Sequence, residues 1–236
     1  RFMQRTQTSQ PPGKDFTTWD LPRLFAEINK HIVLSLSAAE TLKKTPIADY
    51  DALLVKGNVS DTYRPTLYDF LAHEALAFYS SGEQAAAKAQ DEFELSAGSP
   101  IFATADEFLK WKPETTNTDS ATFKAIRLFQ ELLKFHADNK DRTACLDADL
   151  LRLNFGSNKA FGEEKNARYK VALKRYADEH AKHVISTRAM HRWATVLHGE
   201  KKFVEAHKIA TQGENRFPNS IGGKRCHNLI EQIEAR

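Results

Sequence analysis

The strongest constraint on the fold of this chain is a nearly continuous helical pattern of apolar residues from Ser120 onward. Large apolar side chains recur every three or four positions in residues 120–139, and the same spacing returns after each short polar break. Residues at that spacing share one face of an α-helix, so each run predicts an amphipathic helix. No stretch shows the alternation of apolar and polar residues that is typical of a half-buried strand.

The N-terminal half carries the same signal over shorter stretches. Residues 18–36 offer two capping candidates, Thr18 and Asp20, and place Pro22 in the first turn of a predicted helix. Residues 64–79 form a second strong pattern of this kind. The 10 Gly and 8 Pro are few, whereas sandwiches and barrels need more turn residues. We therefore predict an all-α protein built from antiparallel helical hairpins.

Polar breaks divide the chain into segments. Residues 1–15 predict an extended arm or linker, and residues 16–95 an N-terminal helical lobe. Residues 96–119 mix Pro, Gly, Ser and Thr with short apolar pieces, so they predict an irregular connector with one helical turn at 105–111. Residues 120–236 form a predicted C-terminal helical lobe, which could also be continuous with the first. Within it, Gly156 is expected to end the helix that begins near residue 143.

Charge and hydropathy argue against a nucleic-acid partner and against a membrane-spanning segment. The chain has 34 Lys and Arg against 31 Asp and Glu, and both signs are spread along it, so it lacks the clustered basic footprint of nucleic-acid binding. No apolar run approaches the ~20 residues of a membrane span. Residues 1–15 also lack the apolar core of a signal peptide. We expect no nucleic-acid partner, no transmembrane segment in this chain, and, because it begins with Arg1, a fragment of a longer precursor.

Residues 194–218 match a tetratricopeptide-like unit, which pairs two antiparallel helices over ~34 residues. Ala194 occupies the small position of the first helix and Phe203 follows the turn. Ala206 and Gly213 allow close approach, and Pro218 ends the second helix. Such units stack with a right-handed twist and present an extended binding surface. An unrelated helical hairpin is the open alternative, because small residues are common at helix contacts.

Histidines are the main candidates for chemistry. His180 and His183 are spaced to share one helix face, and His191 and His198 follow closely in the sequence. Imidazoles are common metal ligands, so the alternative function is a metal-dependent enzyme or metal-binding protein that uses this cluster. The chain has no His-Glu-x-x-His motif, however. We expect no metal, cofactor or catalytic residue.

Two cysteines are too few for a disulfide framework. Cys145 lies among helix formers without a Gly-rich elbow. Cys226 follows Gly222 and Gly223 and precedes His227, but adjacent residues point about 100° apart on a helix, so the two do not form a dyad. Isolated cysteines usually behave as small buried hydrophobes. We therefore expect two free, mostly buried thiols.

Four stretches carry a family resemblance: "WDLPRLFAEI" (19–28), "RPTLYDFLAHEALAFY" (64–79), "LFQELLKFHADN" (128–139) and "RFPNSIGGKRCHNLIEQIE" (216–234). From roughly residue 16 to the end, the chain resembles the helical N-terminal region of large bacterial α2-macroglobulin-like proteins. The resemblance implies a non-catalytic interaction or structural module of an exported, peptidase-binding protein in the periplasm or cell envelope. Its implied partners are other domains of the same polypeptide, envelope proteins or peptidases. The thioester signature Cys-x-x-Gln of that family is absent at both cysteines, so covalent trapping of a peptidase is not expected here.

Overall fold

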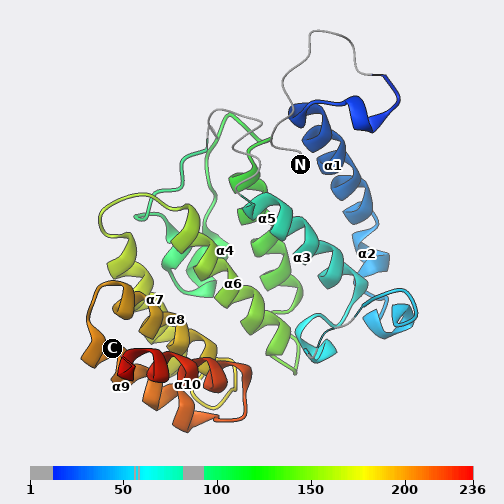
Figure 1. Cartoon of the computed structure of the whole chain (residues 1–236). Helices are drawn as coiled ribbons and strands as arrows, with labels where there is room; N and C mark the ends of the chain where they lie inside the picture. Colours follow the sequence, from blue (N-terminus) through cyan, green and yellow to red (C-terminus); the bar gives the residue numbers. More distant parts are fainter. Residues whose placement is uncertain (1–12, 56, 58, 82–92, 236) are drawn as a thin grey trace. The chain divides into compact units, whose positions relative to one another are not determined.

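The computed structural model describes residues 13–55, 57, 59–81 and 93–235 (Figure 1). Every regular element within these ranges is a helix, which confirms the predicted all-α class. Most of the predicted arm, residues 1–12, lies outside the described residues. None of the helices in the described ranges has both the length and the apolar character that crossing a bilayer requires. The chain divides into two compact units, each of which is described by itself.

The first unit contains the described part of Arg1–Glu94 together with Pro113–His136. Its α3 packs against α1, α2 and α5 and supplies the centre of the core. Asp20 caps α1 by accepting from the backbone NH of Arg23 at 3.0 Å, as the sequence predicts. The elements are η2 (Phe16–Thr18), α1 (Leu21–Leu36), α2 (Ala39–Leu42), η3 (Ile47–Tyr50), η4 (Asp61–Tyr63), α3 (Leu67–Ser80) and α5 (Ala121–Phe135).

A buried polar network ties the start of α3 to the end of α5. The Asp69 carboxylate accepts from the Thr66 hydroxyl at 2.7 Å and the Thr66 backbone NH at 3.0 Å, which closes a capping box. Its other oxygen lies 2.6 Å from His136 Nε2, and both side chains are almost fully buried. The two helices are thus fixed by a specific contact between residues 67 positions apart, in addition to apolar packing.

The second unit contains Leu95–Lys112 and Ala137–Arg236. Consecutive helices from α6 to α10 pack each on the next, and α10 also packs on α8 (Figure 1). The elements are η6 (Pro100–Phe102), α4 (Ala105–Lys110), α6 (Thr143–Lys159), α7 (Lys165–Glu179), α8 (Ser186–Gly199), α9 (Phe203–Arg216) and α10 (Ile221–Glu234).

This grouping differs from the predicted segments. The helix α5, expected at the start of the C-terminal lobe, packs on α3 in the first unit. Residues 95–112, expected within an irregular connector, belong to the second unit and bury Ile101, Phe102 and Phe108. The fully buried Arg152 of α6 holds this segment, because its guanidinium donates to the Ile101 carbonyl at 2.7 Å and the Ala103 carbonyl at 3.0 Å.

Gly156 does not end a helix. It lies inside α6, which continues to Lys159. A Cβ at this position would stand 2.8 Å from Ile101 Cγ1 and 2.9 Å from Phe102 Cε1. The glycine is therefore explained by the close approach of η6, which the local sequence pattern does not reveal.

Candidate functional site

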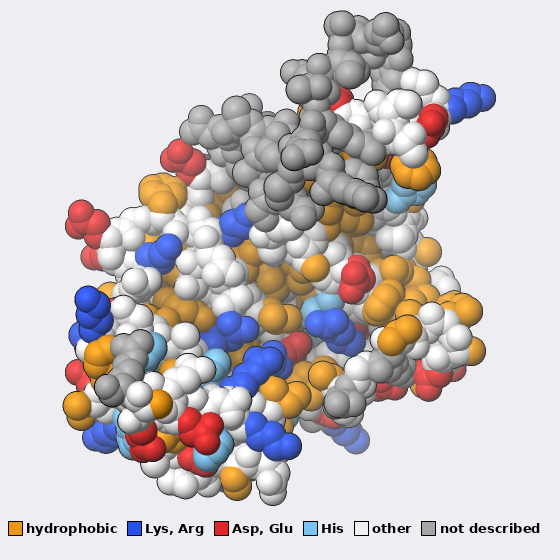
Figure 2. All heavy atoms as spheres, in the orientation of Figure 1, with side chains coloured by type: hydrophobic (Ala, Val, Ile, Leu, Met, Phe, Trp, Pro, Cys, Tyr) orange, Lys and Arg blue, Asp and Glu red, His pale blue; other side chains and the backbone are white. Residues whose placement is uncertain are grey.

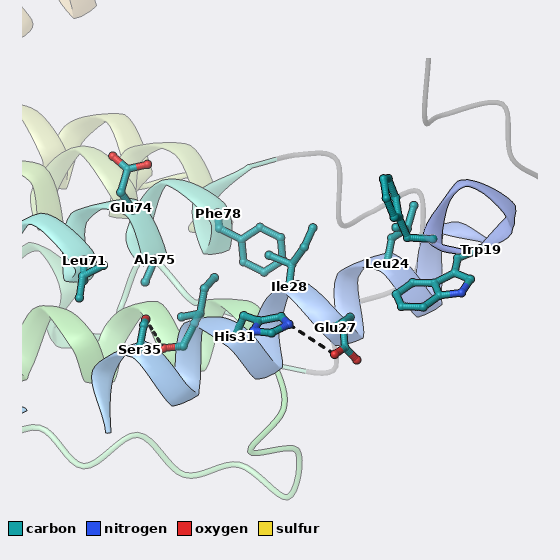
Figure 3. A pocket seen from close by; sticks show the side chains of 12 residues that line it. Trp19, Leu24, Glu27, Ile28, His31, Ser35, Leu71, Glu74, Ala75 and Phe78 are labelled. Atoms are coloured by element: carbon teal, nitrogen blue, oxygen red, sulfur yellow. Dashed lines mark hydrogen bonds and ion pairs between the residues drawn. The ribbon is translucent and has the colours of Figure 1, made fainter. Parts of the chain in front are cut away.

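An apolar groove runs between α1 and α3 of the first unit (Figure 3). Its volume is about 580 Å³, within the range of ligand-binding clefts. The two helices run in opposite directions, so Leu24 lies towards Phe78 and Ser35 towards Leu71 (Figure 3). The groove is lined by Phe16, Trp19, Leu24, Glu27, Ile28, His31, Ile32, Ser35, Leu71, Glu74, Ala75 and Phe78.

Contacts at one end of the groove hold α1 on α3. The rings of Phe25 and Phe78 pack with centroids 5.8 Å apart. The Tyr79 hydroxyl donates to Asn29 Oδ1 at 3.0 Å, and Lys124 of α5 donates to the same oxygen at 3.3 Å. Asn29 is therefore a single acceptor that joins three helices of the unit.

The helix α1 leaves part of its apolar surface exposed. Leu21 is its only buried residue. Ile28 in the groove is 41% exposed, while Val33 and Leu34 on the same helix are 53% and 57% exposed. Hydrophobic side chains also gather elsewhere on the surface of this unit, over the segment between α2 and α3 (Figure 2). An exposed apolar patch of this kind is typical of a surface that binds another polypeptide.

Two carboxylates stand at the groove. Glu27 accepts from Lys30 Nζ at 2.8 Å and lies 3.4 Å from His31 Nε2, and the hydrogen bond from Lys30 lowers the pKa of Glu27. Glu74 is exposed on the rim formed by α3, and the described residues offer it no hydrogen bond or ion pair (Figure 3). The groove is thus apolar inside and carries an uncompensated negative charge at its edge.

The prediction from sequence did not include this groove, although a signal was present. Ile32, Val33 and Leu34 are consecutive, and consecutive residues point about 100° apart on a helix. Apolar residues therefore cover more of α1 than a single contact with α3 can bury.

A second, polar cavity of about 240 Å³ lies in the second unit among α4, α6 and α7. It brings together Arg142, Cys145, Asp149, Arg175 and His180. Two of these groups are already engaged, because Asp149 accepts from Arg152 Nη2 at 2.6 Å and Arg175 donates to the Phe102 carbonyl at 3.0 Å. The cavity is chiefly a network of internal ion pairs and hydrogen bonds.

The thiols in this unit are poor nucleophiles. Cys145 and Cys226 are free and buried. Burial raises the pKa of the Cys145 thiol despite the nearby Arg142, and it raises the pKa of Cys226 to about 12. The thiolate is the reactive form, so neither cysteine is activated at neutral pH.

The four candidate metal ligands do not converge. His180 follows the last turn of α7, and His183 lies in the turn before α8, where its Nε2 is 3.2 Å from Thr143 Oγ1. His191 and His198 lie two turns apart on α8. Within the described ranges, no three His, Cys, Asp or Glu side chains are placed to share a metal ion. The expectation that His180 and His183 share a helix face is wrong, because the helix ends at Glu179.

The repeat-packing residues lie at helix contacts of the second unit, except the last. Ala194 and Ala206 are fully buried, and Phe203 is half-buried at the start of α9. A Cβ at Gly213 would stand 2.7 Å from the sulfur of Cys226, so α9 and α10 cross closely there. Pro218 is exposed, just beyond the end of α9.

Comparison with known proteins adds no relative from which a function could be transferred. No family model matches the chain, and no curated protein or solved structure is significantly similar to it.

Proposed function

We propose that this chain is a non-catalytic docking module of an exported α2-macroglobulin-like protein in the cell envelope, and that the groove between α1 and α3 binds an apolar polypeptide segment. The observation that carries the proposal is the uncovered apolar surface of α1, on which Ile28 lines an open groove and remains 41% exposed. The family assignment rests on the four sequence stretches described above.

The groove favours one kind of occupant. Leu24, Ile32 and Leu71 supply apolar contacts, and Glu74 supplies an unpaired carboxylate at the rim. We infer an amphipathic helix whose apolar face enters the groove, with a Lys or Arg placed to meet Glu74. Other domains of the same polypeptide are the natural source of such a segment, and a peptidase or envelope protein is an alternative source.

The second unit supports the same role as a tetratricopeptide-like stack. The helices α8, α9 and α10 pack on one another, and the small residues Ala194, Ala206 and Gly213 lie at their contacts. This is the pattern expected when one helical hairpin stacks on the first helix of the next. We propose right-handed stacking of this kind, which would hold the module as a scaffold.

A catalytic role is less consistent with the groups present. Asp147 and Asp149 are paired with Arg188 and Arg152, at 2.5 and 2.6 Å, respectively. Protonated thiols and paired carboxylates cannot serve as a nucleophile and its general base. We infer that the module binds and positions other polypeptides.

The test uses a fluorescent model peptide that forms an amphipathic helix of Leu and Lys residues. We expect Ile28→Asp to weaken its binding by about tenfold or more, because a charge would be placed against the apolar face of the peptide. Val204→Asp on α9 is the matched control, since Val204 is exposed and lies in the other unit. Anisotropy titrations on the full chain measure both.

Two results would contradict the proposal. One is equal binding by the wild type and the Ile28→Asp variant; the other is equal weakening by Val204→Asp. A second peptide, which keeps Leu but has Gln in place of Lys, checks the role of Glu74. Glu74→Gln should weaken binding of the Lys peptide and leave binding of the Gln peptide unchanged.

A further inference from the structure

A basic cluster lies on the surface formed by α6, α8 and α10 of the second unit. Gly222 places α10 directly against α8, because a Cβ there would stand 2.1 Å from Thr187 Oγ1 and 2.5 Å from the backbone nitrogen of Arg188. Arg225 follows Gly222 by one helical turn and so projects from the same side of α10. It therefore lies beside the part of α8 that follows Arg188.

Three Arg side chains, those of Arg188, Arg192 and Arg225, lie on this surface, and one of them is paired with a carboxylate. Arg188 is paired with Asp147 of α6 at 2.5 Å. Arg192, one turn further along α8, donates to the Asn154 side chain of α6 and has no carboxylate partner among the described residues. Arg225 makes no hydrogen bond or ion pair in the same ranges. The charges on this surface therefore leave an excess of positive charge.

The pKa values of Arg192 and His191 are shifted in the direction that an excess of positive charge produces. Burial lowers the pKa of Arg192 from its usual range, the Tyr169 hydroxyl of α7 opposes that shift, and Arg188 and Arg225 add to it. Burial, together with Arg225 and Arg192, lowers the pKa of the half-buried His191 to about 4. Neutral His191 has no ring partner in the described chain and can donate or accept a hydrogen bond.

We propose that Arg192, Arg225 and His191 form a binding site for the carboxylates of an acidic polypeptide segment. Guanidinium groups bind carboxylates through paired hydrogen bonds. Arg192 is bonded only to the neutral side chains of Asn154 and Tyr169 among the described residues, and Arg225 has no acidic partner in the same ranges. An acidic segment is favoured over a nucleic acid because the cluster itself is small, and the Lys and Arg residues of the rest of the chain are interspersed with acids and form no extended basic surface. This site is independent of the groove in the first unit.

The test measures binding of a fluorescein-labelled peptide of Asp, Glu, Gly and Ser to the full chain by anisotropy. We expect Arg192→Gln and Arg225→Gln each to weaken binding by about tenfold, because each removes a charge-assisted hydrogen bond. Lys224→Gln is the matched control. Lys224 is also exposed on α10 but points about 100° away from Arg225, so its loss should change the affinity by less than about twofold.

Further arms separate the possible ligands. A peptide with Asn and Gln in place of the acids should not bind, and inorganic phosphate should compete only at much higher concentration than the acidic peptide. The imidazole NMR signals of His191 should shift on addition of the acidic peptide and not on addition of the amide peptide.

Several outcomes would overturn the proposal. Equal weakening by Lys224→Gln and Arg225→Gln would mean a diffuse electrostatic attraction without a site. Phosphate that competes as well as the peptide would mean a general anion site, and tighter binding of a single-stranded oligonucleotide would mean a nucleic-acid surface. No binding of the peptide would also refute it. Arg225 is exposed and unpaired in the described structure, so its substitution tests the site even if Arg192→Gln disturbs folding.

Discussion

At the scale of single residues, Arg152 makes several hydrogen bonds in the interior of the second unit. Its guanidinium donates to Asp149 at 2.6 and 2.9 Å and to two carbonyls of residues 101–103, and it lies over the ring of Phe108 with a centroid distance of 4.7 Å. Burial lowers its pKa from the usual range, while Asp149 acts in the opposite direction. A buried charge of this kind is tolerated only because nearly every donor is used.

We predict that Arg152→Lys lowers the free energy of unfolding by about 3 kcal/mol, because an ammonium cannot reach Asp149 and both carbonyls at once. Arg168→Lys is the control: Arg168 forms an exposed ion pair with Glu164, and its replacement should change stability by less than about 0.5 kcal/mol. Urea denaturation of both variants measures the difference. Equal stability of the two variants would show that the contacts of Arg152 contribute little.

At the scale of helices, the packing of α10 on α8 depends on Gly222. We predict that Gly222→Ala costs about 3 kcal/mol, near the upper end for overpacking, because the new methyl would meet backbone as well as the Thr187 side chain. Gly199→Ala at the end of α8 meets nothing within 4 Å and should change stability by less than about 0.5 kcal/mol. Thermal unfolding distinguishes the two, and a neutral Gly222→Ala would mean that the helices separate readily.

The position of His191 on α8 predicts a pH dependence. Its pKa is about 4 in the folded chain against the usual 6.5, so the unfolded chain binds more protons between these values. Stability should therefore fall as the pH is lowered from about 6.5 to about 4. His191→Gln should reduce that slope, because it removes the group that takes up a proton on unfolding. Urea denaturation at several pH values measures the slope, and an unchanged slope in His191→Gln would refute the assignment.

Helices were the most predictable feature of this chain. Periodicity and capping residues are local, so α1 begins after Asp20 and α4 spans Ala105–Lys110, close to the predicted bounds. Contacts between distant residues were not predictable in the same way. The contact of Gly156 with Ile101 and the pairing of Asp69 with His136 depend on which helices meet. The exposed apolar surface of α1 likewise becomes a groove only once α3 lies beside it.

At the scale of the whole molecule, the chain passes between the two units more than once, because residues 95–112 belong to the second unit and residues 113–136 to the first. A composition-based boundary near residue 120 missed this arrangement. Segments rich in Pro, Gly and Ser are usually predicted to be linkers. Here Ile101 and Phe102 are buried, and Arg152 and Arg175 donate hydrogen bonds to the carbonyls of Ile101 and Phe102, respectively.

This division predicts the behaviour of two fragments. Residues 95–236 contain the complete second unit and should unfold cooperatively. Residues 120–236 lack Ile101, Phe102 and Phe108, each of which contributes about 2 kcal/mol through burial, and the sum approaches the whole stability of a typical domain. We expect the shorter fragment to lose its cooperative transition. Circular dichroism during heating compares the two, and equally cooperative unfolding would refute the division.

The anchoring by Arg152 also has a consequence during synthesis on the ribosome. Ile101 is made 51 residues before Arg152, so at about 5–20 residues per second its partner emerges roughly 3–10 s later. Throughout that interval Ile101 and its apolar neighbours cannot yet be buried against α6, whereas α5 can already pack on α3. We therefore expect the nascent chain to fold the first unit before the second. Residues 95–112 should depend on chaperones until α6 has been synthesised.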